Sequence, residues 1–172
     1  LRRVEAMDLW PAGGVTIAIA MRASSPATGR YPFAGGNSSQ TNTILSPFYT
    51  SPGVAADAAA YYRVDGGANL IASQTTNAAA FDGNDTVLVA VDNGSGVTVY
   101  QDGAAGTTRS YTRGANTITT NILALGALVR QYGASSWMAM RVHRVTIWAT
   151  PLNSTDRAAA LTALAAKQGR TL

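Results

Sequence analysis

Residues 86–100, TVLVAVDNGSGVTVY, decide the fold. Two valine-rich runs are separated by a turn at 92–96 that contains glycine, and glycine adopts the positive φ that tight hairpin turns require. The second run ends at Asp102-Gly103, which is a further turn. The stretch therefore predicts an antiparallel β-hairpin near the centre of the chain.

Another strand is predicted at 15–21, VTIAIAM, where large apolar side chains alternate with small ones. Successive side chains of a strand point to opposite faces, so the large ones share one face. They are Val15, Ile17, Ile19 and Met21. We expect a half-buried strand.

Turn-forming residues divide the rest of the chain into short segments. Residues 24–43 contain Ser, Pro, Gly and Asn throughout, which indicates a long loop with room for one short strand. Pro47 limits residues 44–49 to an edge strand or an extended loop, because proline cannot donate to a central ladder. Further strands are expected at 61–64 and 70–73, which flank a turn at 65–67, and at 107–113, 121–128 and 137–148.

One helix is predicted near the C-terminus. It begins at one of the capping residues Asn153, Ser154 or Thr155, and Asp156 suits the positive end of its dipole. Gly169 ends it. Many short strands followed by one helix favour a sandwich over a parallel α/β sheet. The apolar stripe of the helix is formed by Ala158, Leu161, Leu164 and Ala165.

The composition fits a single domain covering residues 1–172. There are no cysteines, which excludes disulfides, thiolate metal sites and a cysteine nucleophile. Charged residues make up only 13%, so the surface is covered largely by small neutral residues. Such a surface favours assembly with other subunits, including a homo-oligomer. A genome biased towards Ala, Gly and Arg codons is the alternative explanation.

The net charge of +4 comes from scattered arginines and a single lysine, Lys167. A nucleic-acid interface needs a basic stripe or patch with interleaved aromatics, so we expect no nucleic-acid partner. No apolar run approaches the ~18 residues of a membrane span, so we expect no membrane insertion. Residues 1–3, LRR, lack the apolar core that follows in a signal peptide, and we expect the chain to be part of a larger polypeptide or assembly.

Four blocks, in order, resemble the concanavalin A-like superfamily of lectins and glucanases, in particular its laminin-G-like (LamG) jelly-roll domains of bacterial or bacteriophage type. The blocks are 15–25, the hairpin 87–103, 124–127 and 142–153, the last of which resembles a closing strand that feeds a short capped helix. Residues 84–86 depart from the pattern, since relatives often carry an aromatic there and this chain has Phe81 instead. The resemblance implies an all-β, two-sheet antiparallel jelly-roll sandwich with one short C-terminal helix.

Catalytic residues are scarce. Glucanases of this superfamily use two glutamates close together on one strand, but Glu5 is the only glutamate here. His143 is the only histidine, which excludes a multi-histidine metal site and suggests a structural or surface role. We therefore expect no enzyme. A glycosidase that uses aspartates instead would lose sugar release when Asp82 or Asp85 is replaced by alanine.

A calcium site is the one cofactor that the sequence suggests. Asp82, Asn84 and Asp85 place three oxygen-bearing side chains on a glycine-containing loop, where they can gather around a hard cation. Laminin-G-like and legume-lectin-like relatives often use such loop aspartates. The spacing is not that of an EF-hand, and a plain turn explains it equally well.

Sugar binding requires aromatic rings that stack on a pyranose, with polar side chains beside them. Residues of this kind lie in or near the early loops, and we assign ligand binding to Tyr31, Tyr61, Tyr62 and Arg63. Because Tyr61 and Tyr62 are adjacent, at most one of them faces the core. We assign core or helix packing to the tryptophans Trp10, Trp137 and Trp148.

Two functional hypotheses follow from these patterns. The first is a virion structural component of a capsid, tail or fibre, which contacts neighbouring protein subunits and reaches cell-surface glycans. The alternative is a carbohydrate-binding module of a secreted, extracellular bacterial enzyme or adhesin. The absence of the glutamate pair argues against catalysis in both.

Overall fold

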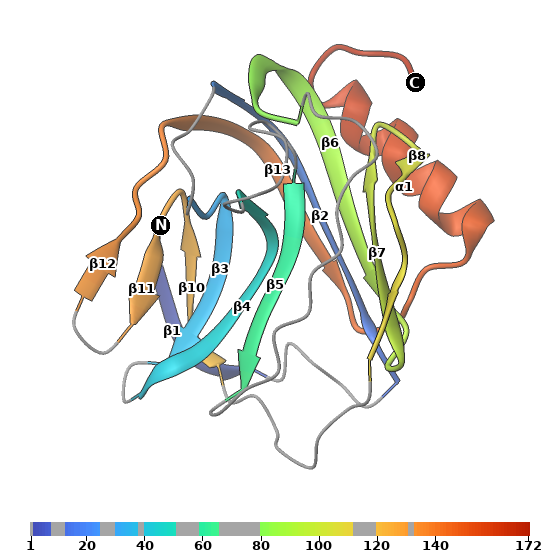
Figure 1. Ribbon diagram of the computed structural model, residues 1–172. Helices are drawn as coiled ribbons and strands as arrows, with labels where there is room; N and C mark the ends of the chain where they lie inside the picture. Colours follow the sequence, from blue (N-terminus) through green and yellow to red (C-terminus); the bar gives the residue numbers. More distant parts are fainter. Residues whose placement is uncertain are drawn as a thin grey trace.

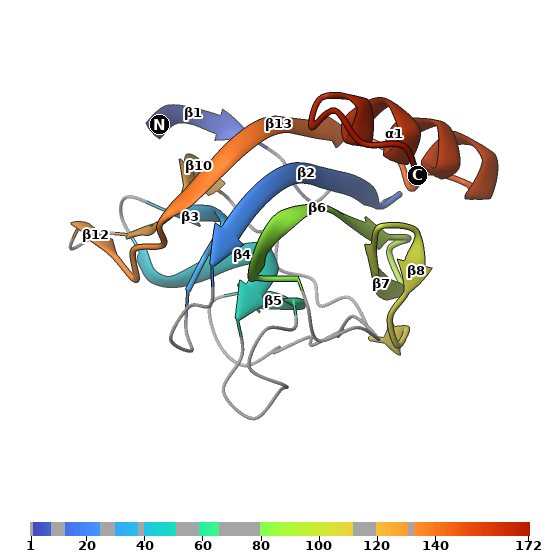
Figure 2. The same ribbon diagram turned by 90° about the horizontal axis from the view of Figure 1, so that it is seen from above.

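The computed structural model describes residues 2–7, 13–24, 30–37, 40–50, 59–65, 80–111, 120–130 and 133–172. In these residues the strands form two antiparallel sheets that face each other, and a helix packs outside one of them (Figures 1 and 2). The predicted two-sheet jelly-roll sandwich with one C-terminal helix is confirmed. None of the described helical residues forms a segment long and apolar enough to cross a membrane.

The first sheet has five described strands. Its order is β1 (Arg2–Met7), β10 (Thr120–Leu125), β3 (Phe33–Asn37), β4 (Gln40–Thr50) and β5 (Ala59–Asp65). A short ribbon of β11 (Leu128–Arg130) and β12 (Gly133–Ser135) lies beside it.

The second sheet carries the features on which the functional site depends. Its order is β13 (Met140–Trp148), β2 (Val15–Ser24), β6 (Asp82–Asp92), β7 (Gly96–Gln101) and β8 (Ala104–Ala105). The two-residue strand β9 (Arg109–Ser110) pairs with β7. The predicted hairpin is β6 and β7, paired from Leu88 opposite Gln101 to Asp92 opposite Val97.

Both faces of β2 are packed, one against the first sheet and the other against the helix. Its predicted apolar face, Val15 to Met21, enters the core between the sheets, as expected. The opposite face is also buried, because Ala18 and Ala20 pack under helix α1 (Ser154–Ala166), so the half-buried prediction was wrong. The helix contributes Leu161, Leu164 and Ala165, and each buried leucine stabilises the fold by roughly 1.5–3 kcal/mol.

The helix ends are as predicted. Asn153 is the N-cap, and its side-chain oxygen accepts a hydrogen bond from the backbone N–H of Asp156 at 2.9 Å. At the other end Gly169 takes a φ of 72°, and the N–H of Arg170 donates to the carbonyl of Ala165. Of the predicted apolar stripe, Ala158 lies exposed.

Two sequence expectations about strands in the first half of the chain need correction. Residues 24–43 include β3 and the start of β4, so the predicted loop was too long. The edge assignment of residues 44–49 was wrong, because β4 lies between β3 and β5. Pro47 falls at an irregularity in the pairing with β5, between Ser46 and Tyr49, where no ladder donor is required.

The later strands are also shorter than expected. Within 107–113 only Arg109–Ser110 is a described strand, and 121–128 divides into β10 and β11 at Gly126, whose φ is 71°. The strand expected at 137–148 begins at Met140. Residues 61–64 lie in β5, which pairs with β4, while 70–73 lie outside the described residues.

Candidate functional site

A groove of about 220 Å³ lies on the outer face of the second sheet, between β13 and α1. Alternate residues of β13 line one wall, because strand side chains repeat every two residues. The facing wall is helical, and alanines there leave the space between the two elements open. The lining residues are Arg144, Thr146, Trp148, Ala160, Ala163, Leu164 and Lys167.

The register of β13 explains why its side chains face the helix. Arg144, Thr146 and Trp148 stand opposite Ala20, Ala18 and Thr16 of β2, the face on which the helix packs. Trp148 is half-buried against the residues packed between this sheet and the helix, so its indole forms a fixed wall. We call these residues the outer cluster: Ala18, Ala20, Val87, Val89, Leu161, Leu164 and Ala165.

Thr16 fixes the connection from β13 to the helix. Its hydroxyl donates to the carbonyl of Thr150 at 3.0 Å and accepts from the N–H of Leu152 at 2.8 Å. The chain is thereby tied to the sheet just after Trp148 and just before the N-cap Asn153. The strand and the helix keep a set separation, and the groove between them is preformed.

Two cationic side chains line the groove, Arg144 and Lys167, and both are exposed. In the part of the chain that the structure describes, neither side chain has an acidic or hydrogen-bonding partner. Their charges are therefore available to a ligand. An aromatic wall, a threonine hydroxyl and two cations can together hold an apolar ring face and an anionic group.

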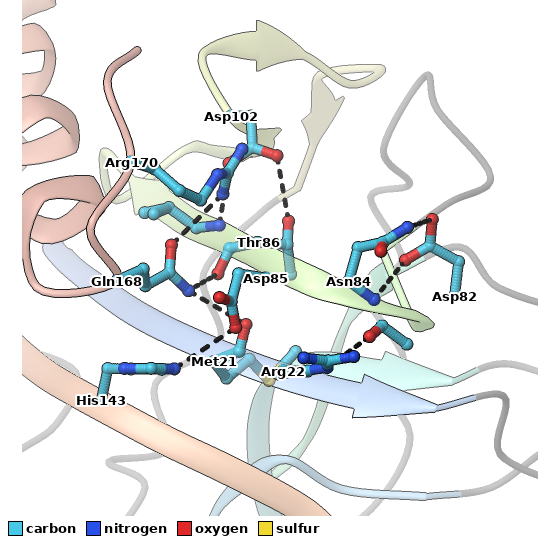
Figure 3. Close-up of polar contacts among 12 residues, drawn as sticks. Met21, Arg22, Asp82, Asn84, Asp85, Thr86, Asp102, His143, Gln168 and Arg170 are labelled. Carbon is cyan, nitrogen blue, oxygen red and sulfur yellow. Dashed lines mark hydrogen bonds and ion pairs between the residues drawn. The ribbon is translucent and has the colours of Figure 1, made fainter.

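Polar contacts hold the segment after the helix on the sheet (Figure 3). The side-chain amide of Gln168, which follows Lys167, donates to the carbonyls of Met21 at 3.1 Å and Thr86 at 2.9 Å. These carbonyls belong to neighbouring strands, so Gln168 ties the end of the helix to both β2 and β6.

Arg170 completes this attachment. Its guanidinium donates to Oδ1 of Asp102 at 3.0 Å and to the side-chain oxygen of Gln168 at 3.2 Å (Figure 3). The same Asp102 oxygen accepts the N–H of Val87 at 2.9 Å. Lys167, which lines the groove, is thus followed by a segment that makes three hydrogen bonds to the sheet and its Asp102 turn, two from Gln168 and one from Arg170 to Asp102.

His143 and Asp85 approach each other across β2, with Nε2 and Oδ1 3.3 Å apart (Figure 3). His143 lies at a register irregularity of β13 between Val142 and Arg144. Neither of these two atoms has a hydrogen bond of good geometry, so the contact is an ion pair when the imidazole is protonated.

The residues predicted to bind calcium do not point at one centre. Both oxygens of Asp82 accept hydrogen bonds from Asn84, from its backbone N–H at 2.9 Å and its side-chain amide at 2.8 Å, while Asp85 turns towards His143 (Figure 3). The backbone hydrogen bond from Asn84, followed by that from its side chain, lowers the pKa of Asp82 below its ordinary value. Among the described residues there is no group of three or more His, Cys, Asp or Glu side chains that could hold a metal ion.

Of the four residues predicted to bind sugar, the structure describes the side chain of only one. Tyr31 is only 7% exposed, and its ring packs against Tyr49 with centroids 4.9 Å apart. Tyr61, Tyr62 and Arg63 lie on β5, and their side chains are outside the described residues.

The assignment of the tryptophans to packing positions is confirmed only in part. Trp148 packs against the outer cluster as predicted, but it lines the groove as well, which the sequence analysis missed. Trp137 is 66% exposed, so its assignment to the core was wrong. The residue before it, Ser136, has a φ of 55°, and this left-handed turn precedes the outward-facing indole. Trp10 lies outside the described residues.

Comparisons with known proteins rest on structure. No family model matches the chain, and no curated protein matches its sequence. A carbohydrate-binding module, CBM40, of a Ruminococcus gnavus sialidase, solved with α2,3-sialyllactose, has a TM-score of 0.71 at 13% identity, over 94% of this chain and 98% of that one.

Two further structures share the fold. The NanB sialidase of Streptococcus pneumoniae has a TM-score of 0.70 at 12% identity, over 92% of this chain and 27% of that one. A heptameric pentraxin of Limulus polyphemus has a TM-score of 0.66 at 15% identity, over 90% of this chain and 71% of that one. Identities this low establish the lectin-like jelly roll alone.

Proposed function

We propose that this chain is a non-catalytic glycan-binding domain that holds an acidic sugar in the groove between β13 and α1. The observation that carries the proposal is the groove itself, which Trp148 lines together with Arg144 and Lys167, two cations that have no acidic partner among the described residues. An indole can stack on the apolar face of a pyranose, and the two cations can hold an acidic group of the same glycan.

The structural neighbours also bear on the choice between a carbohydrate-binding module and a virion component. The chain covers 98% of a carbohydrate-binding module that was solved with a sialylated trisaccharide. They favour the carbohydrate-binding alternative over a virion component, for which the comparisons offer no support. The groove is smaller than the ~300–1,000 Å³ of drug-sized pockets, which suits one sugar ring with the rest of the glycan in solvent.

The proposal excludes catalysis for a chemical reason. Most glycoside hydrolases use two carboxyl groups that flank the scissile bond, and sialidases use a tyrosine nucleophile. No Asp, Glu or Tyr is among the groove residues. Of the nearby carboxylates, Asp102 is paired with Arg170, and Oδ1 of Asp85 lies 3.3 Å from Nε2 of His143.

A glycan array followed by calorimetric titration tests the proposal. We expect binding of acidic glycans, lost in Trp148→Ala and retained in Trp137→Ala, which removes an exposed indole outside the groove. Circular dichroism melts should show that Trp148→Ala is folded, because its indole also contributes to packing. Equal binding by wild type and by folded Trp148→Ala, or no binding of any glycan by wild type, would refute the proposal.

A further inference from the structure

Cationic side chains continue beyond the groove along the outer face of the second sheet. Arg22 of β2 follows Ala18 and Ala20 at a spacing of two, so it points to the face that carries the helix. Arg141 of β13 stands directly opposite Arg22 and therefore shares that face. Both arginines are exposed.

We infer that the groove is one end of a longer site that binds a linear polyanionic glycan. One acidic group lies between Arg144 and Lys167, and a second lies on the pair Arg22 and Arg141. The inference rests on the proposed function and adds to it a class of ligand, a chain with repeated charges in place of a single terminal acidic sugar.

The cross-strand pair of arginines is the main observation. Like charges directly opposite each other in an antiparallel pair are destabilising, and an anion between them removes the repulsion. Arg22 is held in place, since its Nε donates to the carbonyl of Gly83 at 2.5 Å, and this leaves its terminal nitrogens for a ligand. The side chain of Arg141 has no ion pair or hydrogen bond in the described part of the chain.

The carboxylates nearby do not neutralise these cations. Asp85 stands opposite Arg22 in the register of β2 and β6, but its Oδ1 is 3.3 Å from His143. Asp102 is paired with Arg170, and Asp82 accepts both hydrogen bonds from Asn84. Among the described residues, the four cations Arg22, Arg141, Arg144 and Lys167 therefore have no carboxylate in ion-pair contact.

The spacing suits a ligand with more than one acidic group. Arg141 and Arg144 stand opposite Arg22 and Ala20, which are two positions apart on β2 and therefore roughly 7 Å apart along the strand. Acidic groups on neighbouring units of an oligosaccharide can contact both ends. A nucleic acid is less suited, because Trp148 is the only aromatic among the groove residues and single strands are held by successive stacking platforms.

Chain length and mutation test the inference together. The probes are heparin-derived disaccharide and octasaccharide, titrated by calorimetry into the full chain. We expect the octasaccharide to bind more tightly, and Arg141→Ala to weaken it about tenfold while leaving the disaccharide unchanged, since one charged hydrogen-bond contact is lost. Arg109→Ala, an exposed arginine on β9, is the matched control and should change neither affinity.

Several results would overturn the inference. They are equal affinity for the two lengths, an unchanged octasaccharide affinity in Arg141→Ala, or tighter binding of a single-stranded oligonucleotide of equal charge that also depends on Arg141. In the first two cases disaccharide binding that depends on Trp148 leaves the proposed function intact. Octasaccharide binding that depends on Arg141 but not on Trp148 supports the long site and contradicts the groove.

Discussion

Trp148 and Lys167 line one groove although they come from different elements, the last residue of β13 and the C-cap of α1. The indole is fixed by packing against β2, and the lysine precedes a segment anchored by Gln168 and Arg170. A ligand that contacts both would bridge the sheet and the helix. Binding should therefore stabilise the attachment of the helix, because a ligand that binds only the folded arrangement raises its stability.

Removing one cation should separate charge recognition from ring stacking. In Lys167→Ala we expect affinity for an acidic sugar to fall about tenfold, since a charge-assisted hydrogen bond is lost, while affinity for the neutral parent sugar stays unchanged. Ser154→Ala, at an exposed position of the same helix, is the control. Calorimetry at two salt concentrations checks the result, and a Lys167→Ala affinity equal to wild type would exclude a contact with this side chain.

Filling the groove should block binding without unfolding the domain. Ala163 lines the groove and is exposed, so Ala163→Leu adds bulk where no core atom is displaced. Leucine also has a high helix propensity, and we expect stability within about 0.5 kcal/mol of wild type. Glycan affinity should fall to an undetectable level, whereas Ala159→Leu, at an exposed position outside the groove residues, should bind normally. Undiminished binding by Ala163→Leu would place the ligand elsewhere.

The helix should depend on its N-cap. Asn153→Ala removes the hydrogen bond to the N–H of Asp156 and is expected to cost about 1 kcal/mol in the free energy of unfolding. Asn153→Ser keeps an acceptor oxygen for this N–H, loses the hydrogen bond from Nδ2 to the Asp156 carboxylate as alanine does, and should cost much less. Urea denaturation measures both, and equal losses in the two variants would show that the capping hydrogen bond contributes nothing.

Truncating a buried leucine of the helix should lower the free energy of unfolding more than removing the N-cap does. Leu161 is buried in the outer cluster and does not line the groove, so Leu161→Ala is expected to lower the free energy of unfolding by about 2–4 kcal/mol. Thr162→Ala at the neighbouring exposed position should be nearly neutral. A loss below about 1 kcal/mol in Leu161→Ala would mean that the helix is not packed on β2 as described.

Acid titration should reveal the hydrogen bonds of Asp82. Hydrogen bonds from Asn84 lower the pKa of this carboxyl in the folded state, so its contribution is present above the unfolded pKa and is lost as the pH falls through the folded pKa. Because the group is exposed, the effect is small. Denaturation midpoints of wild type and Asp82→Asn should therefore converge in strong acid, and a difference that grows with acidity would have the wrong sign.

Calcium should leave the domain unchanged. Both Asp82 oxygens are used by Asn84, and Asp85 faces His143, so the three predicted ligands do not converge. We expect the same melting temperature with millimolar calcium and with a chelator. A calcium-dependent rise that disappears in Asp82→Ala would restore the sequence-based expectation.

Local patterns account for most of the fold. Alternation at 15–21 identified the inward face of β2, the glycine-containing turn identified the β6–β7 hairpin, and Asn153 with Gly169 identified both helix ends. These features depend on neighbouring residues. Pro47 was misjudged because a register irregularity in the pairing of β4 with β5 depends on the partner strand, which local sequence does not reveal.

The candidate site was harder to foresee, because it depends on contacts far apart in the chain. Thr16 bonds Thr150 and Leu152 from the opposite end of the sequence, and these bonds set the separation of β13 and α1. A signal was nonetheless present at 144–148, where arginine, threonine and tryptophan alternate on one face. Trp137 was misassigned because a serine, Ser136, forms the left-handed turn before it, and no glycine in the sequence indicates such a turn.

The most direct measurement is the response of the indole N–H signals in a nuclear magnetic resonance titration with an acidic oligosaccharide. The three tryptophans, Trp10, Trp137 and Trp148, can be assigned by single substitutions to phenylalanine. A glycan-binding groove between β13 and α1 predicts a saturable shift of the Trp148 indole, with the exposed Trp137 indole unmoved. A shift confined to Trp137 or Trp10, or no shift at saturating glycan, would contradict it.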